Sequence, residues 1–253
     1  MSKDTTFLNY SKYYDLLYQD KDYSAEVDYI KSLLLQNGVV NGNILEFGSG
    51  TGIHGRLLSN SGYKVHGIEN SMEMVSICKL TDNFTCQQGD ITSIKLGRTF
   101  DAVISLFHVI SYQTTNIELH AVFNRAAEHL KPSGILIFDF WYSPAVYNIR
   151  PTIRVKRMKN LNFEITRIAE PTLFNNENRV DVNFTLFVKN LSSGMIESFS
   201  ETHKMRHFSL PELDLLAEAN NFKRVNVEEF LSKANVSEST WGVCVTYQKI
   251  DNE

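Results

Sequence analysis

The fold of this chain is decided by the stretch Asn43-Ile44-Leu45-Glu46-Phe47-Gly48-Ser49-Gly50-Thr51-Gly52-Ile53-His54-Gly55-Arg56-Leu57-Leu58. A short apolar run typical of a β-strand leads into three glycines at alternate positions, and an amphipathic helical pattern follows. Glycine allows positive φ and lets a ligand approach backbone that a Cβ would shield. The helix that follows offers unpaired backbone N–H groups. The stretch therefore predicts a strand, a tight turn and a helix, with a nucleotide-like cofactor at the turn.

The composition indicates a soluble globular protein. The 253 residues are 43% hydrophobic and 21% charged, so the chain can bury a substantial core in one large domain. The net charge of -4 gives no electrostatic reason for a nucleic-acid partner.

Cysteine spacing and hydropathy bear on metal sites and on location. Cys78, Cys86 and Cys244 form no CxxC pair and no zinc spacing with histidine, so we expect neither a metal site nor a disulfide framework. Residues 1–6 lack the apolar core of a secretory signal, and no stretch reaches the roughly 18 apolar residues of a membrane span. These features predict a cytoplasmic protein.

The first 36 residues form a predicted helical lid. Apolar residues recur at helical spacing and indicate two helices, separated near residues 19–22. The segment is rich in tyrosine, and Tyr14 and Tyr18 lie one helical turn apart on one face. Two interpretations stay open: the tyrosines pack a helix on the main domain, or they cover a bound cofactor.

Residues 37–145 alternate between strand and helix patterns. After the first strand, strand patterns cover residues 64–69, 84–91, 100–107 and 135–141. A turn is predicted at residues 131–134, and Ser71 is expected to cap a helix. The alternation indicates a doubly wound α/β sheet with ligands at the carboxyl ends of its strands. Glu69 ends a strand about 20 residues past the glycines, where a carboxylate can accept hydrogen bonds from ribose hydroxyls.

Residues 150–208 change to two-residue alternation, which predicts an antiparallel β insertion. Residues 209–253 then contain a helical pattern from Leu210 to Ala219 and two strand patterns, near 223–230 and 242–250, that would complete the main sheet. The predicted architecture is a single α/β domain with a mostly parallel, seven-stranded sheet and an antiparallel insertion late in the chain. The exposed alternation of the insertion also suggests a homodimer surface.

Four motifs lie in order between residues 44 and 110. They are Leu45-Glu46-Phe47-Gly48-Ser49-Gly50-Thr51-Gly52, Gly67-Ile68-Glu69-Asn70-Ser71-Met72-Glu73-Met74, Gly89-Asp90-Ile91 and Phe100-Asp101-Ala102-Val103-Ile104-Ser105. In these motifs the chain resembles the Rossmann-like methyltransferases that use S-adenosyl-L-methionine. The resemblance implies that cofactor as methyl donor and S-adenosyl-L-homocysteine as product.

The resemblance also implies a cofactor site. Its expected members are Tyr14, Tyr18, Glu46, Gly48, Ser49, Gly50, Gly52, Glu69, Asn70, Ser71, Met74, Asp90, Ile91, Ser105, Leu106 and Phe107. The glycines would approach the methionine portion, Asp90 would accept from the adenine amino group, and Met74 or Asn70 would flank the base. Aromatic faces would stabilise the sulfonium cation by about 0.5–2 kcal/mol each. The alternative for the two acids, Glu69 and Asp90, is that they are solvated strand ends.

Three further segments narrow the resemblance. They are Tyr13-Tyr14-Asp15-Leu16-Leu17-Tyr18, Gly50-Thr51-Gly52-Ile53-His54 and Phe138-Asp139-Phe140-Trp141-Tyr142-Ser143-Pro144. With the insertion, they resemble the bacterial N-methyltransferases that dimethylate the amino group of nucleotide-linked deoxysugars, of the desosamine and mycaminose type. Two positions depart from that pattern: Phe140 replaces a proline, and His108-Val109 replaces small residues.

The acceptor site is expected outside the cofactor motifs, because methyl transfer depends mainly on the alignment of acceptor and donor. The candidates for catalysis are His108, Tyr112 and Tyr14. A neutral histidine can take the acceptor proton near pH 7. The candidates for substrate binding are Trp141, Tyr142 and Arg206, through stacking or a phosphate contact.

Several alternatives stay open at this point. The acceptor-site candidates would serve packing if they lie in the core, and Arg206 and His207 would be solvated if they lie at a strand end. The chain would methylate a sugar hydroxyl if His108 acts as a base, or would bind the cofactor without turnover. A dehydrogenase is disfavoured, because the glycine spacing departs from GxGxxG.

Overall fold

The computed structural model describes residues 10–250. Its helices are α1 (Tyr14–Leu17), α2 (Tyr23–Gln36), α3 (Ile53–Asn60), α4 (Met72–Ile77), α5 (Asn116–His129), α6 (Ser143–Ile149) and α7 (Leu210–Ala219), with shorter turns η1 (Tyr10–Tyr13), η2 (Val109–Tyr112) and η3 (Asn175–Glu177). Residues 1–9 of the predicted lid, including the segment tested for a signal sequence, lie outside the described residues.

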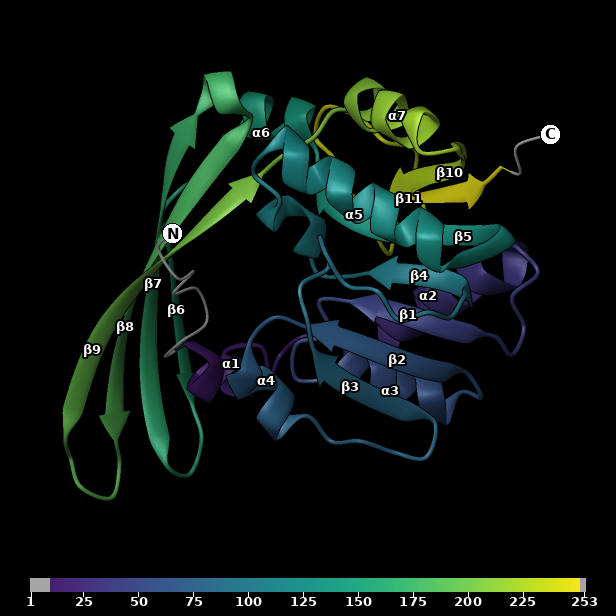
Figure 1. Ribbon diagram of the computed structural model, residues 1–253. Helices are drawn as coiled ribbons and strands as arrows, with labels where there is room; N and C mark the ends of the chain where they lie inside the picture. The colour runs from purple at the N-terminus through teal and green to yellow at the C-terminus, as the bar shows by residue number, and fades with distance from the viewer. Residues whose placement is uncertain (1–9, 251–253) are drawn as a thin grey trace.

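Two sheets organise the molecule (Figure 1). The strands of the larger sheet are β1 (Asn43–Phe47), β2 (Lys64–Glu69), β3 (Phe84–Gln88), β4 (Phe100–Ser105), β5 (Leu130–Trp141), β10 (Phe222–Glu229) and β11 (Gly242–Lys249). Their order is β10-β11-β5-β4-β1-β2-β3. The pairs from β5 to β3 are parallel, whereas β11 runs antiparallel to both β5 and β10. The predicted seven-stranded, mostly parallel sheet is confirmed.

Helices cover both faces of the large sheet, because each face is apolar. On one face, α5 and α7 pack their buried side chains against those of β4 and β5. On the other face, α2 and α3 pack against β1, β2 and β4. With both faces covered, only the edges and the strand ends remain for binding, and the ends of parallel strands are where such sheets hold ligands.

The second sheet is antiparallel, in the order β6-β7-β8-β9, and confirms the predicted insertion. Its strands are β6 (Arg154–Lys159), β7 (Phe163–Phe174), β8 (Arg179–Asn190) and β9 (Ile196–Arg206). One face buries Ile165, Leu186 and Val188 against Tyr10, Tyr13 and Leu17 of the N-terminal segment. Figure 1 shows α1 between the two sheets. The tyrosines Tyr10 and Tyr13 therefore pack on the insertion and not on the main sheet.

One local prediction was wrong, and one helix was not predicted. The turn expected at residues 131–134 lies inside β5, as a bulge: Phe100 pairs with Leu130 but Ala102 pairs with Ile135, and Ser133 takes φ +57°. The turn residues thus bend a strand without ending it. Helix α6 was not predicted, although Pro144 stands in its first turn, where proline is well tolerated.

The described residues contain no helix that is both long and apolar enough to cross a membrane. Within residues 10–250, no group of three or more His, Cys, Asp or Glu side chains is arranged to hold a metal ion. The division of the chain into lid, core, insertion and final segment stays a prediction.

Candidate active site at the strand ends

The three turn glycines serve two different purposes. All three have positive φ, +71°, +56° and +77° in order. A Cβ on Gly48 would lie 2.4 Å from a methyl of Val109, and one on Gly52 would lie 2.3 Å from the Cys78 sulfur. A Cβ on Gly50 would meet nothing within 4 Å. Gly48 and Gly52 therefore allow close packing inside the protein, and Gly50 alone presents open backbone.

Glu69, at the end of β2, lies beside this open backbone. Its two carboxylate oxygens accept hydrogen bonds from the Gly50 and Ser71 backbone N–H groups, each at 2.8 Å. The Ser71 side chain caps α4 by accepting from Met74, as predicted. Burial raises the pKa of Glu69, and the backbone hydrogen bonds oppose that rise. Each carboxylate oxygen keeps a lone pair that can accept from a further hydroxyl.

Glu46 supports the turn from beneath. Its carboxylate accepts a 2.7 Å hydrogen bond from the Ser49 hydroxyl, and the side chain is only 1% exposed. A Cβ on Gly55 would lie 2.6 Å from a Glu46 oxygen, so glycine makes room for the acid there. Burial raises the pKa of Glu46 to about 8. Glu46 and Ser49 thus fix the shape of the turn.

The predicted adenine-side residues lie at the ends of β2 and β3. Asn70 and Asp90 are exposed, whereas Met74 and Ile91 are buried. One Asp90 oxygen accepts from the backbone and the hydroxyl of Thr92. The Asp90 side chain is therefore oriented by its own loop while staying open to solvent.

The end of β4 is held by a buried acid on β5. Asp139, 1% exposed, lies 2.7 Å from Nδ1 of His108 and accepts from the His108 backbone N–H at 3.2 Å. Burial raises the pKa of Asp139, but the charge and hydrogen bonds of His108 lower it further, so the net shift is downward. Both Phe107 and His108 have left-handed φ, +64° and +61°. Such backbone is costly for residues with a Cβ and concentrates at functional sites.

Aromatic side chains surround His108. The rings of Phe107 and Trp141 lie 5.9 Å from its imidazole, and Trp141 also meets Trp241 at 6.0 Å. Phe107 contacts Tyr18 at 5.0 Å, and Tyr18 contacts Tyr14 at 4.8 Å. The predicted residues Tyr14, Tyr18, Phe107, His108 and Trp141 therefore form one continuous cluster.

Polar contacts hold the N-terminal segment, the predicted lid, against this cluster. The Lys21 ammonium lies 3.7 Å from the centre of the Phe107 ring and 2.7 Å from a Glu26 oxygen. That oxygen also lies 2.7 Å from Nε2 of His54. Thr51 of the glycine turn donates to Asp15 on α1 at 2.9 Å. One face of Phe107 is thus occupied by Lys21.

Ser105 and Tyr112 make contacts with distant segments that could not be predicted from the sequence. The Ser105 hydroxyl donates to the Phe47 carbonyl at 3.3 Å and is buried, and Leu106 is 3% exposed. The Tyr112 hydroxyl lies 2.8 Å from Nδ1 of His203 on β9. Tyr112 therefore links the end of the large sheet to the insertion.

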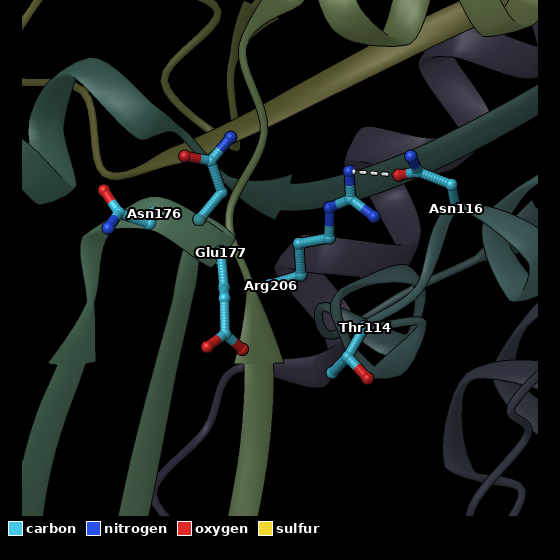
Figure 2. A pocket seen from close by; sticks show the side chains of 6 residues that line it. Thr114, Asn116, Asn176, Glu177 and Arg206 are labelled. Atoms are coloured by element: carbon cyan, nitrogen blue, oxygen red, sulfur yellow. Dashed lines mark hydrogen bonds between the residues drawn. The ribbon is translucent and has the colours of Figure 1, made fainter.

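Tyr142 and Arg206 lie apart from this cluster. Tyr142 packs on the hydrophobic core. Arg206 is 9% exposed, and its Nη2 donates to Asn116 at 2.8 Å and to Glu212 at 2.5 Å. Arg206 lines a separate polar pocket of about 370 Å³, together with Thr114, Asn116, Asn176, Glu177 and Asn178. Figure 2 shows Arg206 there, with its hydrogen bond to Asn116. The neighbouring His207 is not solvated but buried, with Nδ1 2.8 Å from the Ser143 hydroxyl.

Sequence reasoning missed four residues of the cluster: Asp139, Lys21, Glu26 and Trp241. A usable signal existed for Asp139, a lone acid within the apolar run of β5. No local pattern marks the other three, because their contacts bring together segments far apart in the chain.

The raised pKa of Glu46 gives a test of the turn. The native carboxyl keeps its proton up to about pH 8, whereas an unfolded carboxyl loses it near pH 4.3. Between these values the unfolded state binds fewer protons, so the free energy of unfolding should fall as pH rises. We expect Glu46→Gln to remove that fall, worth on the order of a few kcal/mol, in urea unfolding at pH 5 and pH 9. The exposed Glu170→Gln is the control, and an equal fall in Glu46→Gln and wild type would contradict the assignment.

Comparison with known proteins identifies a methyltransferase domain and similar enzymes. Residues 44–134 match the family model described as Methyltransferase domain. A dTDP-3-amino-3,4,6-trideoxy-alpha-D-glucopyranose N,N-dimethyltransferase of Streptomyces venezuelae is 28% identical over 210 residues, which are 82% of this chain and 87% of the relative. A dTDP-3-amino-3,6-dideoxy-alpha-D-glucopyranose N,N-dimethyltransferase of Streptomyces fradiae is 28% identical over 68% of both chains. The crystal structure of Streptomyces venezuelae DesVI has a TM-score of 0.80 at 24% identity, covering 95% of this chain and 98% of that one.

These matches cover the glycine turn, the strand ends and the insertion. Residues 44–134 are thus a methyltransferase domain, and the chain as a whole has the Rossmann-like fold of the DesVI structure.

Proposed function

We propose that this methyltransferase acts on the amino group of a nucleotide-linked deoxy-amino sugar. The relatives named above are amino-sugar N,N-dimethyltransferases and match most of the chain. The observation that carries the proposal is the pair of His108 and buried Asp139, 2.7 Å apart beneath the aromatic cluster. The pair provides a proton acceptor near the carboxyl ends of β4 and β5, and ligands bind at the carboxyl ends of the strands in such sheets.

The residues of the turn fit the cofactor. Gly50 presents backbone with no atom where its Cβ would stand, and the adjacent Glu69 carboxylate has lone pairs for ribose hydroxyls. When bound, S-adenosylmethionine supplies an electrophilic methyl group on a sulfonium cation. Gly50 would lie along the methionine portion, Glu69 would hold the ribose, and Asp90 with Asn70 would face the adenine. Tyr14 and Tyr18 would face the sulfonium.

The amine must lose a proton before it can act as a nucleophile. Alkyl ammonium groups titrate above neutral pH, with reference pKa values from about 7.7 to 10.4. Asp139 engages Nδ1 of His108 and leaves Nε2 to take the proton. The N–H bond breaks, its electron pair stays on the amine nitrogen, and the proton passes to Nε2. The Asp139 carboxylate then stabilises the imidazolium that results.

The aromatic residues would shape the acceptor pocket. Trp141 and Trp241 form a wall beside His108, and Tyr14 and Tyr112 lie on the insertion side. Flat apolar faces of this kind suit a deoxysugar, which has few hydroxyls to satisfy. Arg206 lies in a separate pocket, where a contact with the nucleotide portion stays a prediction. The cytoplasmic location, the lack of a nucleic-acid partner and the homodimer also stay predictions.

One prediction concerns the cofactor site. We expect Glu69→Gln to weaken binding of S-adenosylhomocysteine by about 10- to 100-fold, because hydrogen bonds to a charged group contribute about 1.5–3 kcal/mol. Titration calorimetry measures the affinity directly. Glu73→Gln, an exposed acid on α4, should leave it unchanged. Equal affinities in Glu69→Gln and wild type would rule out the ribose role.

A second prediction tests the proposed acceptor. Mass spectrometry should detect one or two added methyl groups on nucleotide-linked amino sugars and none on analogues with a hydroxyl in place of the amine. The His–Asp pair also suits O-methylation, and pH separates the two functions. His108→Asn removes the proposed proton acceptor and should slow amine methylation about 10²- to 10⁴-fold at pH 7. That loss should shrink at pH 9, where the amine sheds its proton to water.

A hydroxyl keeps its proton at both pH values, so its methylation would stay equally slow in His108→Asn at pH 9. Methylation of the hydroxyl analogue alone would replace the amine proposal with the O-methyltransferase reading.

A further inference from the structure

Arg167 on β7 faces the lid segment. It pairs across the sheet with Lys156, so the two side chains share one face. Its Nη1 donates to the Tyr10 hydroxyl at 2.8 Å and to the Tyr18 hydroxyl at 3.3 Å. The guanidinium also lies over the rings of Tyr18 and Phe184, at 5.7 Å and 5.0 Å. Arg167 is therefore held in place, half-buried, between the insertion and α1.

Arg167 forms no ion pair within the described part of the chain. Across residues 10–250 its hydrogen bonds go to two hydroxyls and to no carboxylate. The nearby acid Asp20 is paired with Lys156, which also donates to the Leu17 carbonyl at 3.0 Å. Within the same residues, the enclosed Nε of Arg167 has no acceptor. A cation withdrawn from water without a counter-ion is costly, so this position is suited to an anion brought by a ligand.

The Tyr18 hydroxyl adds a hydrogen-bond donor at the same place. The Tyr10 and Tyr18 oxygens lie 3.0 Å apart, and both accept from Arg167. When the Tyr10 hydroxyl donates to Tyr18, the Tyr18 proton is directed out of this triangle. A planar guanidinium beside a hydroxyl donor matches the oxygens of a phosphate.

The position of Arg167 relates it to the reacting end of the site. Tyr18, which Arg167 touches, contacts Phe107 at 5.0 Å, and Phe107 contacts His108 at 5.9 Å. The anion position therefore lies on the insertion side of the cluster that holds the proton acceptor. A substrate with an amine at one end and a diphosphate at the other could place its amine at the proton acceptor and its diphosphate at the anion position.

We propose that Arg167, with the hydroxyl of Tyr18, binds the diphosphate of the nucleotide-linked acceptor. This inference rests on the proposed function for the identity of the anion. The other anion available at this site is the carboxylate of the methionine portion of the cofactor, and the experiment separates the two sources.

The test is calorimetric binding of thymidine diphosphate, thymidine and S-adenosylhomocysteine to wild type, Arg167→Gln and Arg157→Gln. Arg157 is an exposed residue of β6 that pairs with Thr166, on the opposite face of the sheet. It therefore controls for the loss of a positive charge. Arg167→Gln should weaken thymidine diphosphate about 10- to 100-fold and leave thymidine and S-adenosylhomocysteine unchanged. Arg157→Gln should bind all three like wild type.

Thermal unfolding distinguishes a binding role of Arg167 from a purely structural one. The uncompensated cation predicts that Arg167→Gln melts no lower than wild type, and that thymidine diphosphate raises the melting temperature of wild type more than that of the variant. Three outcomes would overturn the inference: equal diphosphate affinity in Arg167→Gln, no binding to wild type, or weakening of S-adenosylhomocysteine alone. Amine methylation with unchanged diphosphate binding would reject only this inference. Diphosphate binding through Arg167 without amine methylation would reject only the proposed function.

Discussion

The contact between Asp139 and His108 is the interaction on which the rest of the site depends. A buried carboxylate must be paired, and Asp139 engages both the backbone and the ring of a single residue. This fixes the left-handed backbone at the end of β4, which in turn sets the positions of Phe107 and Val109. Phe107 meets the lid through Tyr18 and Lys21, and Val109 fills the space that Gly48 leaves open. This one contact therefore connects the proposed acceptor side to the glycine turn.

Two further buried acids hold the glycine turn through different contacts. Glu46 lies inside and fixes Ser49, whereas Glu69 lies at the strand end and gathers the N–H groups of Gly50 and Ser71. The insertion completes the site from the other side, since β7 carries Arg167 and β9 carries His203. In the proposed function, the large sheet would supply the donor side and the chemistry, and the small sheet would supply contacts for the far end of the acceptor.

The parts of this fold that depend on local sequence patterns could be predicted from the sequence. The alternation of strands and helices, the Ser71 cap and the two-residue rhythm of the insertion each depend on neighbouring residues. The bulge in β5 and helix α6 were missed because tertiary pairing changed the outcome of local turn signals. Within the site, His108 and Trp141 were both named from the sequence and lie side by side, whereas Asp139, Lys21 and Arg167 depend on contacts between distant segments. Tyrosine clustering marked the lid without revealing that Tyr10 and Tyr18 hold an arginine of the insertion.

The central claim is that Asp139 holds His108 with Nε2 free to accept a proton. Nitrogen-15 NMR of the imidazole, assigned with His108→Asn, tests it most directly. The account predicts that the neutral ring carries its proton on Nδ1, facing Asp139, and leaves Nε2 bare. A neutral ring protonated on Nε2 would contradict it, because no lone pair would then face the acceptor.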